Sequence, residues 1–441
     1  MNNTASANIV WLTIDSVRQD HTSFISERDT TPNLKRLSEA SDGQAFYNCI
    51  SHAFATRTST ASILTGMYPS THGVSTTAGT ALSNSFRTIP GLLSEAGYTT
   101  SGISTNAHFS SATNIDKGFD NFLWVNPKNL SEISIRTLIK YALNIRRHSI
   151  GLSTKFGAHL PEFIVNDISK RKIDQLVSEL SPFFFYAHYN GPHSPYFPPL
   201  PYMDEFIDEI NLSLEEALEV AHYRHYKKGV PRLEGTGLDE LTEEEYEALL
   251  AVYDAKLLYT DEMIGRMVEY VRQKTDRKTI IVVTADHGEL IGEKGMVGHG
   301  RYPLDGLVRI PLVVHGFDMD MSDDVLIQHG DVMRSLLNHI SVETGHMDCI
   351  DLRNTEREYT VTIDFDPDVI SLRTDEFKYV DGVDGEKLYE LPDETQDVSS
   401  EYPSKFSWFR KEATQYPQSL SGVDASLNTE MEQQLRDLGY L

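Results

Sequence analysis

The chain has 441 residues, 40% of them hydrophobic and 10% aromatic, enough to build one large α/β core and a smaller C-terminal unit. A formal net charge of −26 and a pI near 5.0 argue against binding of nucleic acid or of an anionic membrane through a basic patch. The two cysteines show no spacing typical of a disulfide framework or a zinc site.

The N-terminal residues lead into the first apolar run without the basic and apolar regions of a secretory signal. No apolar run reaches the length needed to span a membrane. A cytoplasmic location is therefore expected.

The first predicted element is a strand at 9–14, whose apolar residues on both parities are typical of a strand buried on both faces of a parallel sheet. It ends in Asp15. In open α/β sheets, ligands bind beyond the carboxyl ends of the strands, so Asp15 is a candidate metal ligand. The alternative is that Asp15 only caps a following helix.

Hydroxyl side chains crowd the segment 55–66, and an apolar helical turn follows them before Gly66. The pattern predicts a helix that ends at Gly66. A hydroxyl at a helix N-terminus lies among unpaired backbone N–H groups and the positive end of the helix dipole, which favour an anion there. The alternative is that Thr58 or Ser59 only caps this helix.

Strand and helix patterns alternate from residue 9 to about residue 315, with a further apolar strand at 183–187. The segment 197–241 is first Pro-rich and then charged, and it is predicted to be a surface insertion over the site. A long helix is predicted at 242–273, with Tyr253 on its face and Asp254 in solvent.

A strand predicted at 279–284 ends in Asp286 and His287, and Gly288 would let the backbone turn away. Asp286 alone would be read slightly better as a helix cap. Because Asp15 follows another buried strand and His287 lies next to Asp286, the pair of strands predicts one cation between their ends.

Taken in order, these segments resemble the sulfatase branch of the alkaline phosphatase superfamily. The resemblance implies an α/β fold, an alkaline-phosphatase-like three-layer sandwich with a large mixed, mostly parallel sheet and a smaller C-terminal α+β subdomain. It divides the chain into a catalytic domain at 1–345 and a subdomain at 346–441 packed on it. The motifs that carry it are Asp15, 31–37, 56–66, 95–100, 118–120, 192–196, 284–288, 298–300, 309–312, 373–379 and 388–391.

Counted back from Gly66, the resemblance puts the family's nucleophile on Thr56 and its Pro and Arg positions on Thr58 and Thr60. Formylglycine, the converted residue of true sulfatases, is made from Cys or Ser and not from Thr. A formylglycine hydrate releases sulfate by elimination, whereas a threonine ester must be broken by a second attack at the central atom. That attack is very slow for an alkyl sulfate, so the sequence favours phosphoryl over sulfuryl transfer.

The resemblance also implies one divalent metal ion, held by Asp15, Thr56, Asp286 and His287. An imidazole ligand suits Mn²⁺ or Zn²⁺ better than Ca²⁺. Phosphonate monoester hydrolases and the lipoteichoic acid synthase group have a similar set. The ion would lower the pKa of the nucleophilic hydroxyl.

Further polar residues match family positions around the bound ester. His193 and His299 are candidate proton donors to the leaving group. Asn106 and His108 match a family Lys-x-His pair, and Arg57 follows the nucleophile, so all three are candidates for substrate binding. His188 and His21 are read as ordinary hydrogen-bonding histidines.

The predicted function is metal-dependent hydrolysis of a phosphate mono- or diester or a phosphonate ester through a covalent Thr56 intermediate. The substrate would be a small molecule or a glycan-linked ester. Three alternatives remain open: a sulfuric ester hydrolase acting on a sulfated metabolite or glycan, a phosphoryl-group transferase, and a catalytically degenerate member that only binds an anion.

Overall fold

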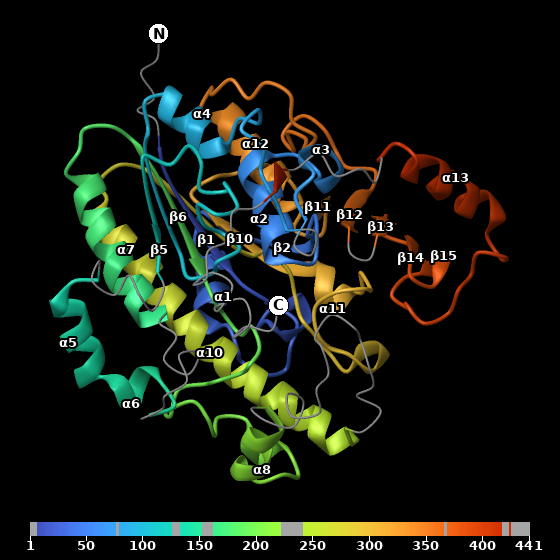
Figure 1. Cartoon of the computed structure of the whole chain (residues 1–441), viewed down its shortest axis with the longest axis horizontal. Helices are drawn as coiled ribbons and strands as arrows, with labels where there is room; N and C mark the ends of the chain where they lie inside the picture. The colour runs from blue at the N-terminus through green and yellow to red at the C-terminus, as the bar shows by residue number, and fades with distance from the viewer. Residues whose placement is uncertain are drawn as a thin grey trace.

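The computed structural model describes residues 7–75, 79–125, 133–151, 162–221, 241–365, 368–416 and 423–424. Its centre is an eight-stranded sheet with the order β11-β2-β10-β7-β1-β6-β4-β5 (Figure 1). Within this sheet only β10 runs antiparallel to its neighbours. The strands are β1 (Asn8–Ile14), β2 (Gly43–Ile50), β4 (Thr99–Ser104), β5 (Asn121–Trp124), β6 (Phe183–Tyr189), β7 (Thr279–Ala285), β10 (Arg309–His315) and β11 (Leu326–Ile327).

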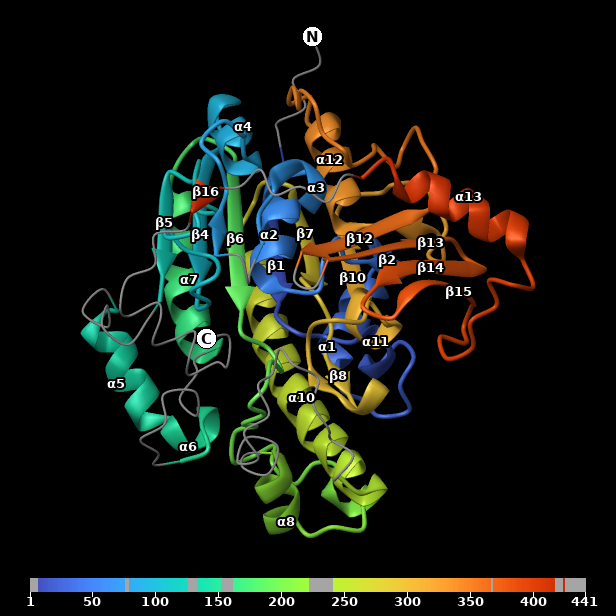
Figure 2. The same ribbon diagram turned by 45° about the vertical axis from the view of Figure 1, so that its right-hand side comes forward.

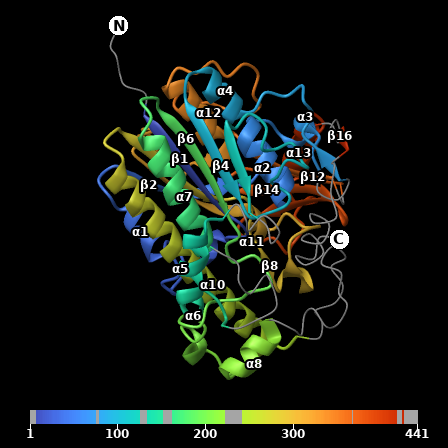
Figure 3. The ribbon, with the colours of Figure 1, turned by 60° about the vertical axis from the view of Figure 1, so that its left-hand side comes forward.

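Helices cover both faces of this sheet (Figure 3). One face carries α1 (Pro32–Ser38), α7 (Glu162–Val177) and α10 (Glu243–Lys274). The other face carries α2 (Thr56–Thr65), α3 (Pro69–His72), α4 (Ile89–Glu95) and α12 (His329–His339). Every residue of β1 and of β6 is buried, as expected for strands covered on both faces. The predicted three-layer sandwich with a mixed, mostly parallel sheet is confirmed.

The register of the three central strands aligns their carboxyl ends. Ile14 of β1 pairs with Tyr189 of β6 on one side and with Ala285 of β7 on the other. The residues that follow, Asp15 and Asp286, therefore leave the sheet side by side. This edge lies at the end of the molecule towards which the arrowhead of β6 points (Figure 2).

The predicted long helix is α10, which begins with a capping box between Thr242 and Glu245. The assignment of Asp254 to solvent is wrong, because its side chain is fully buried, as is that of Tyr253. The Tyr253 hydroxyl donates to the Ser16 carbonyl at 2.9 Å. Helical periodicity could not reveal this contact, since it depends on the loop after β1.

Asp254 anchors two segments that lie far away in the sequence. Its carboxylate lies 2.7 Å from His21 Nδ1 and 2.7 Å from an Arg28 guanidinium nitrogen. Arg28 in turn pairs with Glu209 at 2.6 Å, inside the predicted insertion. Of that insertion, residues 222–240 lie outside the described part of the chain, and the described part includes η4 (Ile207–Glu209) and α8 (Leu214–Glu219).

The C-terminal region forms a separate antiparallel sheet in the order β12-β13-β14-β15, with α13 (Pro403–Ala413) beside it (Figure 2). The main-chain N–H of Ile363 donates to the His52 carbonyl at 2.9 Å and so attaches this sheet to the catalytic region. The predicted boundary between 345 and 346 stays a prediction. The strands are β12 (Thr360–Phe365), β13 (Asp368–Arg373), β14 (Phe377–Gly382) and β15 (Gly385–Glu390).

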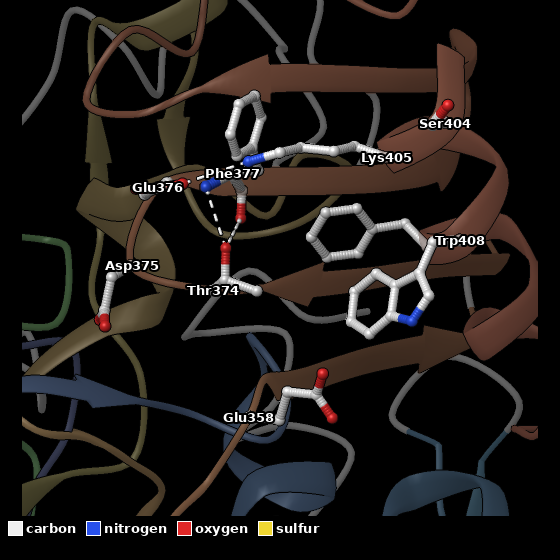
Figure 4. Close-up of a pocket in the computed structure, with 9 residues that line it drawn as sticks. Glu358, Thr374, Asp375, Glu376, Phe377, Ser404, Lys405 and Trp408 are labelled. Carbon is white, nitrogen blue, oxygen red and sulfur yellow. Dashed lines mark hydrogen bonds and ion pairs between the residues drawn. The ribbon is translucent and has the colours of Figure 1, made fainter. Parts of the chain in front are cut away.

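A cavity of about 560 Å³ lies between α13 and the start of β14 (Figure 4). Lys405 crosses it, with its ammonium 3.7 Å from the centre of the Phe377 ring and 3.1 Å from the Glu376 carboxylate. None of the predicted site residues lines this cavity. It belongs to the C-terminal subdomain, away from the carboxyl edge of the large sheet.

No helix among the described residues combines the length and the apolar character that crossing a bilayer requires. The longest of them, α10, carries charged residues in its first and last turns. The expected cytoplasmic location stays a prediction.

Candidate active site

Two buried carboxylates meet at the carboxyl edge of the sheet. Asp15 and Asp286 are both 0% exposed. Ser16 adopts a left-handed conformation with a φ of 62°, which lets its N–H donate to Asp286 Oδ1 at 3.4 Å while its hydroxyl donates to Asp15 Oδ1 at 3.1 Å. A non-glycine residue in this conformation is strained, and such strain is found where a site requires it.

The electrostatics of the pair favour a cation. Burial and the charge of Asp286 raise the pKa of Asp15 to about 7. Burial would also raise the pKa of Asp286, but His287 and His188 lower it below its ordinary value. Asp15 therefore retains a proton to neutral pH in the metal-free site, and a divalent ion could replace this proton.

His287 directs one ring nitrogen at both carboxylates. Its Nδ1 donates to the Gly288 carbonyl at 2.8 Å, which leaves a lone pair on Nε2 in the neutral ring. Nε2 lies 3.3 Å from Thr56 Oγ1, 3.6 Å from Asp15 Oδ1 and 3.8 Å from Asp286 Oδ2. Burial lowers the pKa of His287, yet Asp286 and Asp15 raise it above its ordinary value.

The role expected for Gly288, a sharp turn of the backbone, differs from its role in the structure. A Cβ atom at this position would lie 2.1 Å from the Gly306 carbonyl oxygen, and the Gly288 N–H donates to the Leu307 carbonyl at 2.7 Å. Gly288 is therefore required because α11 (Asp305–Val308) approaches its backbone closely.

Thr56 is the first residue of α2, and Ala55 takes the N-cap position. The helix ends at Gly66 in a left-handed conformation, as predicted. The Thr56 hydroxyl lies 3.5 Å from Asp15 Oδ2. A hydroxyl at this position faces the positive end of the helix dipole, where an anionic group is stabilised.

The alternative that Thr58 or Ser59 caps α2 is wrong, because both lie inside the helix. The Ser59 hydroxyl instead donates to the main-chain carbonyl of Asp286 at 2.7 Å and supports the loop that follows β7. The hydroxyls of Thr58 and Thr60 are buried and have no hydrogen-bond partner among the described residues.

Asn106 lies against the carboxylate and the hydroxyl. Its side-chain amide donates to Asp15 Oδ2 at 3.0 Å and lies 3.4 Å from Thr56 Oγ1. Because the same amide contacts both groups, it fixes the orientation of the hydroxyl relative to Asp15. An oxygen of a bound ester next to Thr56 would lie within reach of this donor.

Arg57 is only 1% exposed, and its Nε donates to His108 Nδ1 at 3.1 Å. The proton of neutral His108 is therefore on Nε2. Burial lowers the pKa of Arg57 to about 10 and, together with the Arg57 charge, lowers the pKa of His108 well below its ordinary value. Arg57 thus orients a neutral imidazole that can donate a hydrogen bond.

His193 and His299 lie together beside the metal-ligand candidates. Their ring centroids are 5.3 Å apart, and the His299 centroid is 4.7 Å from that of His287. His193 Nδ1 donates to the Ser194 carbonyl at 2.6 Å, and His299 Nδ1 lies 3.7 Å from a carboxylate oxygen of Glu289. The structure brings all of the sequence-predicted site residues to one edge of the sheet.

His188 was read from the sequence as an ordinary histidine, yet its Nε2 lies 3.2 Å from Asp286 Oδ2. Side-chain atoms of Asp15, His188 and Asp286 lie within 4.8 Å of one another and form a second possible ligand set. We favour His287 as the ligand because its lone pair faces both carboxylates and Thr56. The position of His188 could have been predicted only from the pairing of β6 with β1, in which His188 lies opposite Thr13.

A hydroxyl at a helix N-terminus beside two buried strand-end carboxylates, on a mixed α/β sheet, is the arrangement that the resemblance to an ester hydrolase led us to expect. The comparisons give the family itself. The protein-family model described as Sulfatase matches residues 7–342, and the chain belongs to the sulfatase family.

Curated relatives are similar at low identity. An arylsulfatase of Clostridium perfringens (strain 13 / Type A) is 25% identical over an alignment of 471 positions, which covers 92% of this chain and 93% of that protein. The multifunctional alkaline phosphatase superfamily protein PehA of Trinickia caryophylli is 27% identical over 181 residues. That match covers 37% of this chain and 35% of PehA, so the chain spans about a third of that relative's length. The uncharacterized sulfatase YidJ of Escherichia coli (strain K12) is 24% identical, and 36% of its length is covered.

Solved structures confirm the fold. A phosphonate monoester hydrolase of Agrobacterium radiobacter superimposes with a TM-score of 0.72 at 19% identity, covering 93% of this chain and 95% of that chain. A protein in complex with its substrate D-glucosamine-2-N,6-O-disulfate superimposes with a TM-score of 0.69 at 18% identity, covering 98% of both. The fold is thus shared by proteins named for phosphonate and for sulfate esters.

Proposed function

We propose that the protein hydrolyses phosphate or phosphonate esters through a covalent intermediate on Thr56, with one divalent metal ion. The observation that carries this proposal is the position of Thr56 Oγ1, 3.3 Å from His287 Nε2 and 3.5 Å from Asp15 Oδ2 at the start of α2. A threonine cannot be converted to formylglycine, so the elimination route for sulfate release is absent.

The chemistry of the donor set supports a bound ion. Asp15, Asp286, His287 and Thr56 supply two carboxylate oxygens, one imidazole nitrogen and one hydroxyl, and burial together with the charge of Asp286 raises the pKa of Asp15 to about 7. The imidazole favours Mn²⁺ or Zn²⁺ over Ca²⁺. When bound, such an ion would lower the pKa of the Thr56 hydroxyl and polarise the ester.

In the first step, the Thr56 hydroxyl gives its proton to Asp15 Oδ2, which lies 3.5 Å away, and Thr56 Oγ forms a bond to phosphorus while the bond between phosphorus and the leaving oxygen breaks. His193 or His299 donates a proton to that oxygen. Asn106 and His108 donate hydrogen bonds to the remaining phosphoryl oxygens, and Arg57 acts by holding His108. The products are a phosphothreonine and a free alcohol or phenol.

In the second step, water attacks the phosphothreonine, and the histidine that lost its proton takes one from the water. The bond between phosphorus and Thr56 Oγ breaks, and Thr56 Oγ takes its proton back from Asp15, which restores the hydroxyl. A second attack at phosphorus is required because the threonine ester has no elimination route. An alcohol in place of water would give the phosphoryl transferase alternative.

Sulfuric ester hydrolysis is the second candidate function. The family assignment and the arylsulfatase that aligns with 92% of this chain favour it. The same Thr56 attack would then give a threonine sulfate that only slow substitution at sulfur could release.

The two candidates are separated by matched aryl esters. With 4-nitrophenyl phosphate or phenylphosphonate against 4-nitrophenyl sulfate, we expect kcat/KM to be at least about a hundredfold higher for the phosphorus ester. The measurement is initial rate of phenol release with added Mn²⁺. Faster release from the sulfate would overturn the proposal and favour a sulfuric ester hydrolase. No release from any of these esters with Mn²⁺, Zn²⁺ or Ca²⁺ would favour an anion-binding protein.

The proton-donor role of His193 and His299 predicts a dependence on the leaving group. For the responsible histidine, substitution by Gln should lower turnover of an alkyl phosphate about a hundredfold or more, but that of a 4-nitrophenyl ester less than about tenfold. A nitrophenolate needs little protonation to leave. His315→Gln is the matched control, because His315 is a similarly buried histidine at the far end of β10. Equal losses on both esters would contradict the assignment.

A further inference from the structure

One helix of this acidic protein has an unusual outer face. Helix α5 (Ile135–Leu143) leaves Ile135, Ile139 and Leu143 exposed, at 76%, 55% and 80% of their surfaces. These positions are four residues apart, so they form one apolar stripe along the helix. The opposite side faces α7, where the Thr137 hydroxyl donates to Asp167 at 2.6 Å.

The charge beside this stripe is opposite to that of the rest of the chain. Residues 134–148 carry four basic residues and no acidic one, whereas the whole chain has a net charge of −26. Arg136 and Lys140 each follow a residue of the stripe, so they line one edge of it. Arg136 and Arg146 are exposed and form no ion pair among the described residues.

We propose that α5 and the following α6 (Ile145–His148) dock on anionic lipid headgroups, with Ile135, Ile139 and Leu143 inserted at the interface. An apolar stripe flanked by basic residues is the pattern of helices that lie in the plane of a membrane surface. The basic residues would contact lipid phosphates, each contributing to binding at an anionic leaflet.

This inference corrects the conclusion drawn from net charge alone. At physiological salt the Debye length is about 8 Å, so charges on the far side of the molecule are screened from the membrane. Lys140 and Arg147 pair with Asp167 and Glu262 at 2.5 and 3.6 Å, so Arg136 and Arg146 supply most of the local attraction. Anionic lipid binding is compatible with an acidic protein when its basic residues are gathered beside an apolar stripe.

A second copy of the chain is a less suitable occupant. Two α5 helices packed on each other would bring like charges together, because the basic residues border the same stripe. Stable protein interfaces also bury about 800 Å² per partner, more than three side chains on one short helix supply. Binding to an anionic lipid surface brings no like charges together and does not need an interface of that area.

The position of α5 and α6 gives the docking a consequence. Both helices lie at the end of the molecule towards which β6 points (Figures 1 and 2). Because β1 and β7 run parallel to β6, Asp15 and Asp286 follow their strands at the same end. Docking would therefore bring the carboxyl edge of the sheet towards the lipid surface. The proposal goes beyond the proposed function and does not depend on it.

Flotation of the full chain with vesicles tests this proposal. We expect binding to phosphatidylcholine vesicles containing phosphatidylglycerol, and little binding to phosphatidylcholine alone. The double variant Ile139→Asp with Leu143→Asp should weaken binding at least about tenfold. The variant Arg136→Gln with Arg146→Gln should weaken it and reduce its salt dependence. Leu180→Asp is the matched control, because Leu180 is 96% exposed outside this surface.

Failure of the wild-type protein to float with either vesicle would overturn the proposal. Equal binding by wild type and both double variants would also overturn it. Thermal unfolding and turnover of a soluble 4-nitrophenyl ester should be unchanged in the variants, which excludes misfolding as the cause. If the α5 variants instead convert a lipid-free dimer to a monomer, the stripe is an interface between copies and the lipid proposal is wrong.

Discussion

Replacement of Thr56 by alanine is expected to remove nearly all turnover, by at least about a thousandfold, while leaving the fold intact. The hydroxyl is the group placed to attack, 3.5 Å from Asp15 Oδ2 at the first residue of α2. Removing it takes away a nucleophile but leaves the buried helix and the other three proposed metal ligands. Thermal unfolding should therefore change little, and kcat on an aryl phosphate should fall.

Thr60→Ala is the matched control for this loss. Its hydroxyl is also buried in α2, but it has no hydrogen-bond partner among the described residues, so its removal should leave most activity. Thr56→Ser should retain a measurable rate because it keeps the hydroxyl. Mass spectrometry of an acid-quenched reaction should find phosphate on the peptide that contains Thr56. A label on Thr58 or Ser59, or an active Thr56→Ala, would require a different nucleophile.

The sequence was sufficient for the core of the fold because buried parallel strands carry a simple signal. The runs that became β1 and β7 are apolar on both parities, and each is followed by an aspartate. Parallel alignment then brings Asp15 and Asp286 together whatever the loops do. These ligand candidates could be predicted because the carboxyl ends of parallel strands lie at one edge of a sheet, and the resemblance indicated that these two strands contribute to one site.

Contacts between segments far apart in sequence could not be predicted in the same way. His188 lies beside Asp286 only because β6 pairs with β1, and strand order cannot be read from one strand's composition. Asp254 is charged at a helical position, yet it is buried because His21 and Arg28 reach it from another segment. Such pairs depend on tertiary packing, which local periodicity does not encode.

The second large effect is expected when a proposed metal ligand is replaced. We expect wild-type protein to bind one Mn²⁺ or Zn²⁺ ion, and His287→Asn to lose affinity by at least about a hundredfold together with most activity. The reason is that His287 Nε2 lies within 3.6 Å of Asp15 and 3.8 Å of Asp286 with its other nitrogen already donating to Gly288. Elemental analysis and calorimetric titration provide the measurement.

In the metal-free protein, the same site should make the folding stability depend on pH. The pKa of Asp15 is raised to about 7 by burial and by Asp286. Protonation of Asp15 therefore stabilises the folded state, and this stabilisation is complete when the pH is below about 4, the pKa of an aspartate in the unfolded chain. This stabilisation is lost as pH rises through about 7, by an amount on the order of a few kcal/mol. Mn²⁺ should restore stability at higher pH, because the ion replaces the proton. Asp15→Asn should remove both effects.

His188 provides the matched control that decides between the two histidines beside Asp286. If His188 only donates to Asp286 Oδ2 at 3.2 Å, His188→Asn should weaken binding by about tenfold but leave the visible spectrum of the Co²⁺-substituted protein unchanged. His287→Asn should change that spectrum, since it removes a ligand atom. The reverse result would make His188 the ligand, and protein that binds no divalent metal after Mn²⁺ addition would contradict the metal site altogether. Because both histidines are buried and contact the same carboxylate, a difference between the variants would reflect coordination and not burial.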